Sequence, residues 1–102
     1  MSLTDVPAWL QHLEEEDLQF IKKLVLASGS LKELADHYGV SYPTIRLRLD
    51  KVIERIRLLD EHAPADALEA RVRLLVADGE MSAKLAKELL QLHKAGSKGG
   101  RK

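Results

Sequence analysis

The residues of this sequence best suited to binding another molecule are the basic side chains of residues 41–58. This segment holds five Lys or Arg and two Asp or Glu, a net charge of +3, in a chain of 102 residues whose net charge is zero. Guanidinium groups bind phosphate and pair with the two major-groove acceptors of guanine through parallel hydrogen bonds. Local charge decides such attraction, because salt confines surface fields to about 8 to 10 Å. The segment is therefore a candidate site for a polyanion.

The apolar residues among these cations predict one long helix that runs to about Glu61. Ser41 is suited to cap this helix, Pro43 is tolerated in its first turn, and Pro64 stops it. One stripe is apolar and is expected to face the core, namely Ile45, Leu49, Val52, Ile53 and Ile56. At about 100° per residue, the outward positions are Pro43, Thr44, Leu47, Arg48, Lys51 and Arg55, with Arg46 beside them.

A shorter helix over Leu31–Tyr38 precedes it, and the pair has the spacing of a helix-turn-helix. Ser30 and Glu33 form an S-x-x-E capping box at its start. Gly39 permits the positive φ that a tight turn needs. Small or apolar residues are expected to fill the interior positions of the pair, namely Leu34, Ala35 and Val40. The alternative is a plain helical bundle whose helices are joined through glycine.

In a helix-turn-helix, the second helix enters the major groove of DNA and reads bases with its N-terminal residues. The candidate DNA-binding residues are therefore Ser41, Tyr42, Pro43, Thr44, Arg46, Leu47, Arg48, Lys51 and Arg55. The arginines suit guanine, and Leu47 or the methyl of Thr44 suits thymine methyl groups. Lys51, Arg55 and the capping Ser41 suit phosphates. Tyr42 is open to two roles, because it can pack against the preceding helix or reach a phosphate with its hydroxyl.

The same helix face has a second interpretation. Arginines on an exposed helix are often only solvated, here paired with Asp50 or Glu54. A leucine at position 47 in an otherwise polar face indicates a contact, but a partner helix would serve as well as DNA. The sequence therefore predicts sequence-specific binding of double-stranded DNA and a role in transcription regulation. The alternative is a protein-interaction or oligomerisation adaptor that uses the same surface.

The run GSLKELADHYGVSYPTIRLRLD, residues 29–50, also carries a resemblance. With its flanks, residues 7–56, it resembles the bacterial family catalogued as domain of unknown function 2089. The resemblance implies a small helix-turn-helix protein that binds DNA and regulates transcription, with a fold similar to the DNA-binding region of sigma factors. On this resemblance the recognition-helix positions are Tyr42, Pro43, Thr44, Arg46 and Arg48. Longer members look to carry a cysteine-bearing metal ribbon ahead of this region, whereas this sequence has no cysteine.

The rest of the chain also has helical spacing, which predicts an all-α fold. Asp5 is expected to cap a helix over residues 7–13. A second helix, opened by the acidic run of residues 14–17, is expected to continue to about Ser28 and to stop at Gly29. The expected apolar face of this second helix is Leu18, Ile21, Leu24 and Val25.

After the long helix, Asp66 and Ser82 are expected to cap two helices of an antiparallel hairpin. Their expected inward residues are Leu68, Val72, Leu75 and Val76 on the first and Leu85, Leu89 and Leu92 on the second. The predicted domains are a helix-turn-helix domain at 1–62, the hairpin at 66–95 and a disordered basic tail at 96–102. Helix-turn-helix proteins commonly read two half-sites as dimers, so residues 66–95 are a candidate homodimer surface. The alternative is that the leucine-rich faces of this hairpin close over the first domain of the same chain.

The remaining residue types point away from enzymes and membranes. Without cysteine there is no disulfide, thiolate zinc site or thiol nucleophile. His12 and Glu16 have metal-ligand spacing but lack a third ligand, and no catalytic motif surrounds the other histidines. No apolar run approaches the roughly 18 residues of a membrane span, and the start has no secretory pattern. We expect a cytoplasmic protein that is not an enzyme and needs no metal, cofactor or small-molecule substrate.

Overall fold

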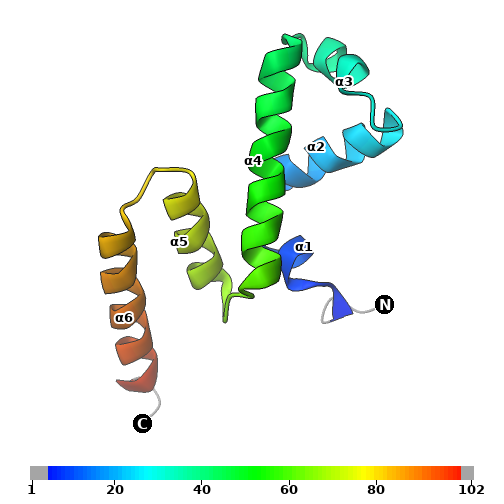
Figure 1. The fold of residues 1–102 in the computed structure, drawn as a ribbon. Helices are drawn as coiled ribbons and strands as arrows, with labels where there is room; N and C mark the ends of the chain where they lie inside the picture. Colours follow the sequence, from blue (N-terminus) through cyan, green and yellow to red (C-terminus); the bar gives the residue numbers. More distant parts are fainter. Residues whose placement is uncertain (1–4, 100–102) are drawn as a thin grey trace. The chain divides into compact units, whose positions relative to one another are not determined.

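The computed structural model describes residues 5–99, with side chains up to residue 96, and this part contains six α-helices and no strand. The helices are α1 (Ala8–His12), α2 (Glu15–Leu26), α3 (Leu31–Tyr38), α4 (Tyr42–Glu61), α5 (Ala67–Ala77) and α6 (Ala83–Gly99) (Figure 1). The chain divides into two compact units, Met1–His62 with α1 to α4 and Ala63–Lys102 with α5 and α6. The predicted all-α fold is confirmed.

The two ends of α3 depend on residues close in the sequence, as predicted, except for one bond of the capping box. Ser30 Oγ accepts a hydrogen bond from the N–H of Glu33 at 3.1 Å, which pairs an amide that the helix itself leaves unpaired. The N–H of Ser30 donates to the carbonyl of Ala27, so the predicted reciprocal bond to Glu33 is replaced by a turn bond. Gly39 ends α3 with φ 67° and ψ 36°, the left-handed conformation that glycine adopts without a steric penalty. Both ends of α3 agree with the prediction.

The two N-terminal helices differ in detail from the prediction. The N-cap of α1 is Pro7 and not Asp5, so the predicted N-cap residue is wrong. The acidic run does lie in the first turn of α2, where carboxylates favour the positive end of the helix dipole. Helix α2 ends at Leu26, because Ser28 and Gly29 both take positive φ. Val25, expected on its apolar face, is exposed.

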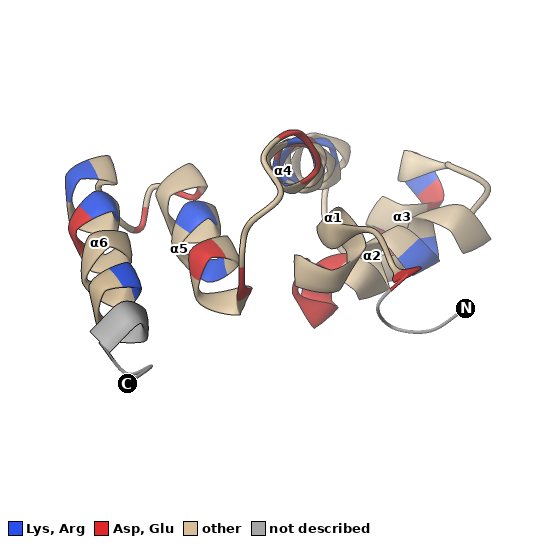
Figure 2. Cartoon of the chain, turned by 90° about the horizontal axis from the view of Figure 1, so that it is seen from below, with Lys and Arg blue, Asp and Glu red and all other residues tan. Residues whose placement is uncertain are grey.

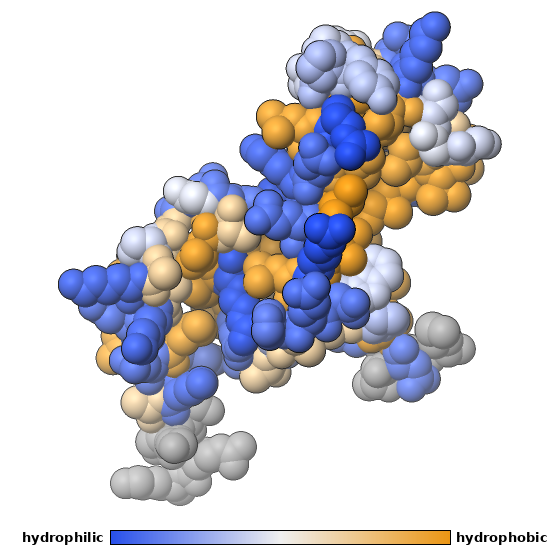
Figure 3. Space-filling model, viewed as in Figure 1, coloured by the Kyte–Doolittle hydropathy of each residue, from blue (hydrophilic) through white to orange (hydrophobic). Residues whose placement is uncertain are grey.

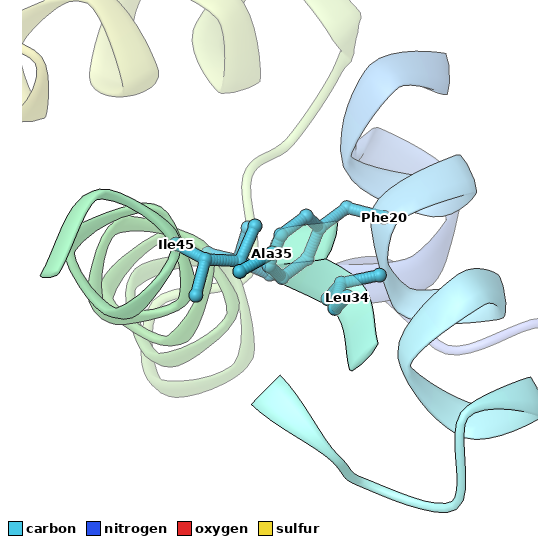
Figure 4. Close-up of a cluster of buried hydrophobic side chains, with 5 residues drawn as sticks. Phe20, Leu34, Ala35 and Ile45 are labelled. Atoms are coloured by element: carbon cyan, nitrogen blue, oxygen red, sulfur yellow. The ribbon is translucent and has the colours of Figure 1, made fainter. Parts of the chain in front are cut away.

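The core of the N-terminal unit joins α2, α3 and α4. Phe20, Leu34, Ala35, Ile45 and Val52 are buried together. Figure 4 shows the ring of Phe20 reaching from α2 toward α3 and α4. Because Ala35 is small, α3 and α4 approach closely beside this ring.

The prediction that Val40 points inward is wrong. Its side chain is exposed, although its N–H donates to the carbonyl of Ala35 at 3.0 Å. The left-handed conformation of Gly39 reverses the chain at this point, and the residue after it therefore leaves the face that α3 buries. The turn is held by backbone hydrogen bonds and not by a buried valine.

The second unit is an antiparallel pair of helices. Asp66 caps α5 by accepting from the N–H of Glu69 at 2.9 Å, and Ser82 accepts from the N–H of Leu85 at 3.1 Å. His93, near the end of α6, lies 2.9 Å from Asp66 at the start of α5, which fixes the antiparallel order. The buried residues of α5 are Ala70, Val72 and Leu74. Leu68, expected inward, is exposed.

Helix α6 departs most from the prediction. Its leucine stripe of Leu85, Leu89 and Leu92 was expected to face inward but is exposed, and Ala86 is buried instead. The small side chain of Ala86 permits close helix approach. The helix also continues to Gly99, so the predicted disordered tail is wrong for residues 96–99, while residues 100–102 lie outside the described part. Each residue added to an existing helix gains a hydrogen bond, which offsets the low helix propensity of glycine.

Candidate nucleic-acid interface

The start of α4 is fixed by a side-chain cap. Ser41 Oγ accepts from the N–H of Thr44 at 3.3 Å, and the hydroxyls of the two residues lie 2.8 Å apart. Pro43 has no N–H, so the amides of Ser41 and Tyr42 are the ones that the first turn can offer to an outside acceptor. The cap also holds the hydroxyl of Thr44 against Ser41 and thereby restricts its rotamer. This end of α4 is therefore a rigid surface that can accept an anion.

Seven of the nine candidate residues are exposed at or near this end of α4. They are Ser41, Tyr42, Pro43, Thr44, Arg46, Leu47 and Lys51. Leu47, in the second turn of α4, is 58% exposed. Tyr42 is also exposed, which leaves its hydroxyl accessible. All seven residues are therefore accessible at the N-cap or in the first three turns of α4.

Arg46 is paired within its own helix. Its Nη2 lies 3.2 Å from Oδ1 of Asp50, one turn later, and both side chains are about half exposed, at 52% and 51%. This is the pairing that the solvated-face interpretation predicts. Ion pairs this exposed stabilise a protein by about 0 to 1 kcal/mol, so an incoming base or phosphate can replace Asp50 at little cost.

Arg48 turns toward α2 and not toward solvent, so its predicted outward position is wrong. Its Nη2 donates to Oε1 of Glu16 at 3.1 Å. Its guanidinium lies over two aromatic rings, 4.9 Å from the ring centroid of Tyr38 and 5.1 Å from that of Phe20. Such cation–π contacts add to the ion pair. Arg48 is therefore part of the packing between α2, α3 and α4.

Arg55 also differs from its predicted place on the outward face. Its Nη1 donates to Oδ1 of Asp17 at 2.8 Å, and the two side chains are only 21% and 7% exposed. Asp17 is a buried charged residue of the described chain. A charge this deep needs a partner, because desolvation of an unpaired carboxylate is costly. Arg55 supplies that partner.

Sequence reasoning missed the two carboxylates that hold these arginines. Glu16 and Asp17 belong to the acidic first turn of α2, which was expected to favour the positive end of the helix dipole and not to pair with α4. The available signal was the opposite charge of two segments, the short acidic run of residues 14–17 and the long basic helix α4. Figure 2, viewed along α4, shows both signs of charge around this helix.

Comparison with family models gives one match, over residues 13–59, to a family described as domain of unknown function (DUF2089)-HTH. Residues 13–59 are therefore similar to this family. The matched segment contains α2, α3 and most of α4, and therefore the caps, the glycine turn and both carboxylate–arginine pairs. Comparison with curated proteins and comparison with solved structures give no significant match.

The matched segment has a second accessible feature, at the C-terminal end of α2. Leu26 is 76% exposed and Val25 is exposed beside it. An open groove of about 310 Å³ lies next to them, between α2 and α3, and is lined by Lys23, Leu26, Ala27, Glu33, Leu34 and His37. Figure 3 shows apolar surface where α2 lies in the same view. This region does not include the start of α4.

The described residues also offer no metal-binding cluster and no membrane-spanning helix. Among residues 5–96, no cluster of three or more His, Asp or Glu side chains has the arrangement to hold a metal ion. Within the described helices, none is both long enough and apolar enough to cross a membrane.

Proposed function

We propose that the protein binds double-stranded DNA by inserting the first two turns of α4 into the major groove. The observation that carries this proposal is the exposed surface of Tyr42, Pro43, Thr44, Arg46, Leu47 and Lys51 on a helix whose start is fixed by the Ser41 cap and the Gly39 turn. The family description, a helix-turn-helix, supports it. A helix of this diameter fits the major groove, and its N-terminal residues then meet base edges.

Within this proposal the exposed residues have different roles. Arg46 exchanges Asp50 for a guanine, whose two major-groove acceptors match a guanidinium. Leu47 and the methyl of Thr44 contact thymine methyl groups. Lys51 and the amides of Ser41 and Tyr42 bind phosphates, which add affinity but carry no sequence information. Arg48 and Arg55 are left out of the contact set, because both are held by α2.

The proposal extends to the biological role. A helix-turn-helix that reads sequence without a catalytic site acts as a transcription regulator, and we place this protein in that class, in the cytoplasm of a bacterium. It requires no cofactor in this role. The family description supports DNA binding, and the step from binding to regulation is ours.

We also propose that the hairpin forms a homodimer, since one helix-turn-helix contacts only a few base pairs. The support is the exposed stripe of Leu85, Leu89 and Leu92, whose four-then-three spacing is that of packed helices. Light scattering on wild type and on Leu89→Glu tests this. A dimeric wild type and a monomeric variant are expected, and a monomeric wild type at high concentration overturns it.

The test of DNA binding is a selection of bound fragments from random DNA, followed by titration of the selected duplex at several salt concentrations. We expect log Kd to rise linearly with log salt, because phosphate contacts release counterions. Arg46→Ala is expected to weaken binding to the selected duplex more than to a scrambled one. Arg71→Ala, in the other unit, is the matched control. The proposal fails if no duplex binds in a salt-dependent way.

The adaptor alternative has its own observation, which is the apolar end of α2. Val25 and Leu26 are exposed beside a groove, and this arrangement suits an apolar segment of a protein partner. Under that function, Leu26→Ser abolishes the interaction of the protein with its partner and Arg46→Ala leaves it intact. The DNA-binding function predicts that Arg46→Ala weakens duplex binding and that Leu26→Ser leaves it intact.

A further inference from the structure

We infer that Glu16 and Asp17 are positioning residues for DNA recognition, which act through Arg48 and Arg55 to set the orientation of α4. The inference rests on the proposed DNA-binding function and assigns a role to side chains that touch no DNA. We call the Glu16–Arg48 and Asp17–Arg55 contacts the α2–α4 ion pairs. The two carboxylates are adjacent on α2, and the two arginines are seven residues apart on α4, which is about two helical turns.

The helices that support α4 do so in different ways. The backbones of α1 and α3 pack closely along α4. Helix α2 reaches α4 mainly through side chains, namely the ring of Phe20 in the core and the α2–α4 ion pairs at its N-terminal end. In Figure 1 the start of α2 meets the middle of α4. The ion pairs therefore fix how α4 is rotated about its own axis relative to the rest of the unit.

The rotation of α4 decides which side chains reach the groove. Arg48 and Arg55 lie on the same flank of α4, and their pairs with α2 prevent that flank from turning outward. The guanidinium of Arg48 is further held by the rings of Phe20 and Tyr38, which themselves stack at 6.1 Å. With this flank fixed, Leu47 and Lys51 are directed outward. Positional errors of even a fraction of an ångström weaken a bidentate base contact.

The sign of the expected effect separates positioning from simple electrostatics. Asp17→Asn removes a negative charge from a DNA-binding domain, and long-range attraction alone predicts tighter binding to every duplex. A positioning role predicts a lower ratio of affinity for the selected duplex over a scrambled one. It also predicts no change in the salt slope, since no phosphate contact is lost.

The experiment measures that ratio and the salt slope for Asp17→Asn, Glu16→Gln and Glu15→Gln. Glu15→Gln is the matched control, because it removes the same charge from the same turn of α2 at an exposed position outside the α2–α4 ion pairs. Each variant is first checked for helical circular dichroism. We expect the ratio to fall about tenfold for Asp17→Asn, as for one lost base contact, with a smaller fall for Glu16→Gln and none for Glu15→Gln.

The arginines give a second readout. For Arg55→Ala and Arg48→Ala, we expect a salt slope equal to that of the wild type, whereas Lys51→Ala lowers it by about 0.9. If Asp17→Asn does not fold, Glu16→Gln carries the test, because the side chain of Glu16 is 77% exposed and its change leaves Arg48 over the rings of Phe20 and Tyr38.

Three results overturn the inference. The first is that Asp17→Asn, or its substitute Glu16→Gln, has the same ratio of affinities for the selected and scrambled duplexes as the control Glu15→Gln. Another is a loss of about 0.9 in slope for Arg48→Ala and Arg55→Ala, which makes them phosphate contacts. The third, absence of salt-dependent binding by the wild type, also overturns the proposed function and is visible before any variant is made.

Discussion

Arg55 and Asp17, 38 residues apart in the sequence, form an ion pair with 2.8 Å between Nη1 and Oδ1. The pair joins the first turn of α2 to the fourth turn of α4 and buries a carboxylate that is 7% exposed. Arg46 and Asp50, in contrast, pair within one helix and are half exposed. Arg55 and Arg46 belong to the same basic segment, but the pair of Arg55 is largely buried and that of Arg46 is half exposed. The two ion pairs must therefore contribute differently to the free energy of unfolding.

That contrast gives the first prediction. Arg55→Ala leaves the carboxylate of Asp17 buried without its arginine, and we expect the free energy of unfolding to fall by about 2 kcal/mol. This is below the range for fully buried pairs, because Arg55 still reaches solvent. Arg46→Ala is expected to lower it by less than about 0.5 kcal/mol. Urea unfolding followed by circular dichroism measures both. Equal losses for the two variants would contradict the assignment of Arg55 to the interior.

The ends of most helices were predictable because they depend on residues close in sequence. Ser30, Ser41, Asp66 and Ser82 each accept a hydrogen bond from the amide three residues later. Gly39 adopts the left-handed conformation that the turn requires. Asp5 shows the limit of this reasoning, since a suitable cap residue two positions too early does not form the cap.

The positions of side chains on the helices were harder to predict. The helical wheel placed Arg48 and Arg55 among the outward positions of α4, because it contains no information about which neighbouring helix covers part of that face. The same limit applies to Val25 and Leu89, which lie on apolar stripes and are nevertheless exposed. Apolar periodicity identifies a face, whereas burial depends on whether another element packs on it. The seven exposed candidate residues of α4 needed no such information.

The turn between α3 and α4 gives a second prediction. Gly39 has φ 67°, and a Cβ built there meets no atom within 4 Å, so the penalty for a side chain is conformational and not steric. We expect Gly39→Val to destabilise by about 1 to 2 kcal/mol and Gly39→Asn by less, because asparagine tolerates this conformation better. Gly96→Ala is the control, since that glycine lies in α6 without positive φ and the change should stabilise by up to about 1 kcal/mol. Unchanged thermal stability in Gly39→Val would refute the turn assignment.

The start of α5 gives a prediction about pH. The N–H of Glu69 donates to the carboxylate of Asp66 and, together with His93, lowers the pKa of Asp66 below its ordinary value. A carboxyl group with a lowered pKa in the folded state stabilises the protein above the unfolded pKa, and this contribution is lost as pH falls through the folded value. We expect the thermal midpoint of the wild type to fall between about pH 5 and pH 3 more steeply than that of Asp66→Asn. Asparagine keeps the cap but does not titrate. Identical acid profiles for the two proteins would exclude this contribution.

The exposed leucine of α4 gives the last prediction, which concerns the bases that the helix reads. Leu47 is 58% exposed, so Leu47→Ala should change the free energy of unfolding by less than about 0.5 kcal/mol. If Leu47 contacts a thymine methyl, replacing that thymine by uracil in the selected duplex weakens wild-type binding and leaves Leu47→Ala binding unaffected. Thr44→Ser tests the other methyl in the same way, because serine keeps the hydroxyl that bonds to Ser41. Equal sensitivity of wild type, Leu47→Ala and Thr44→Ser to uracil would remove both residues from the base-reading surface.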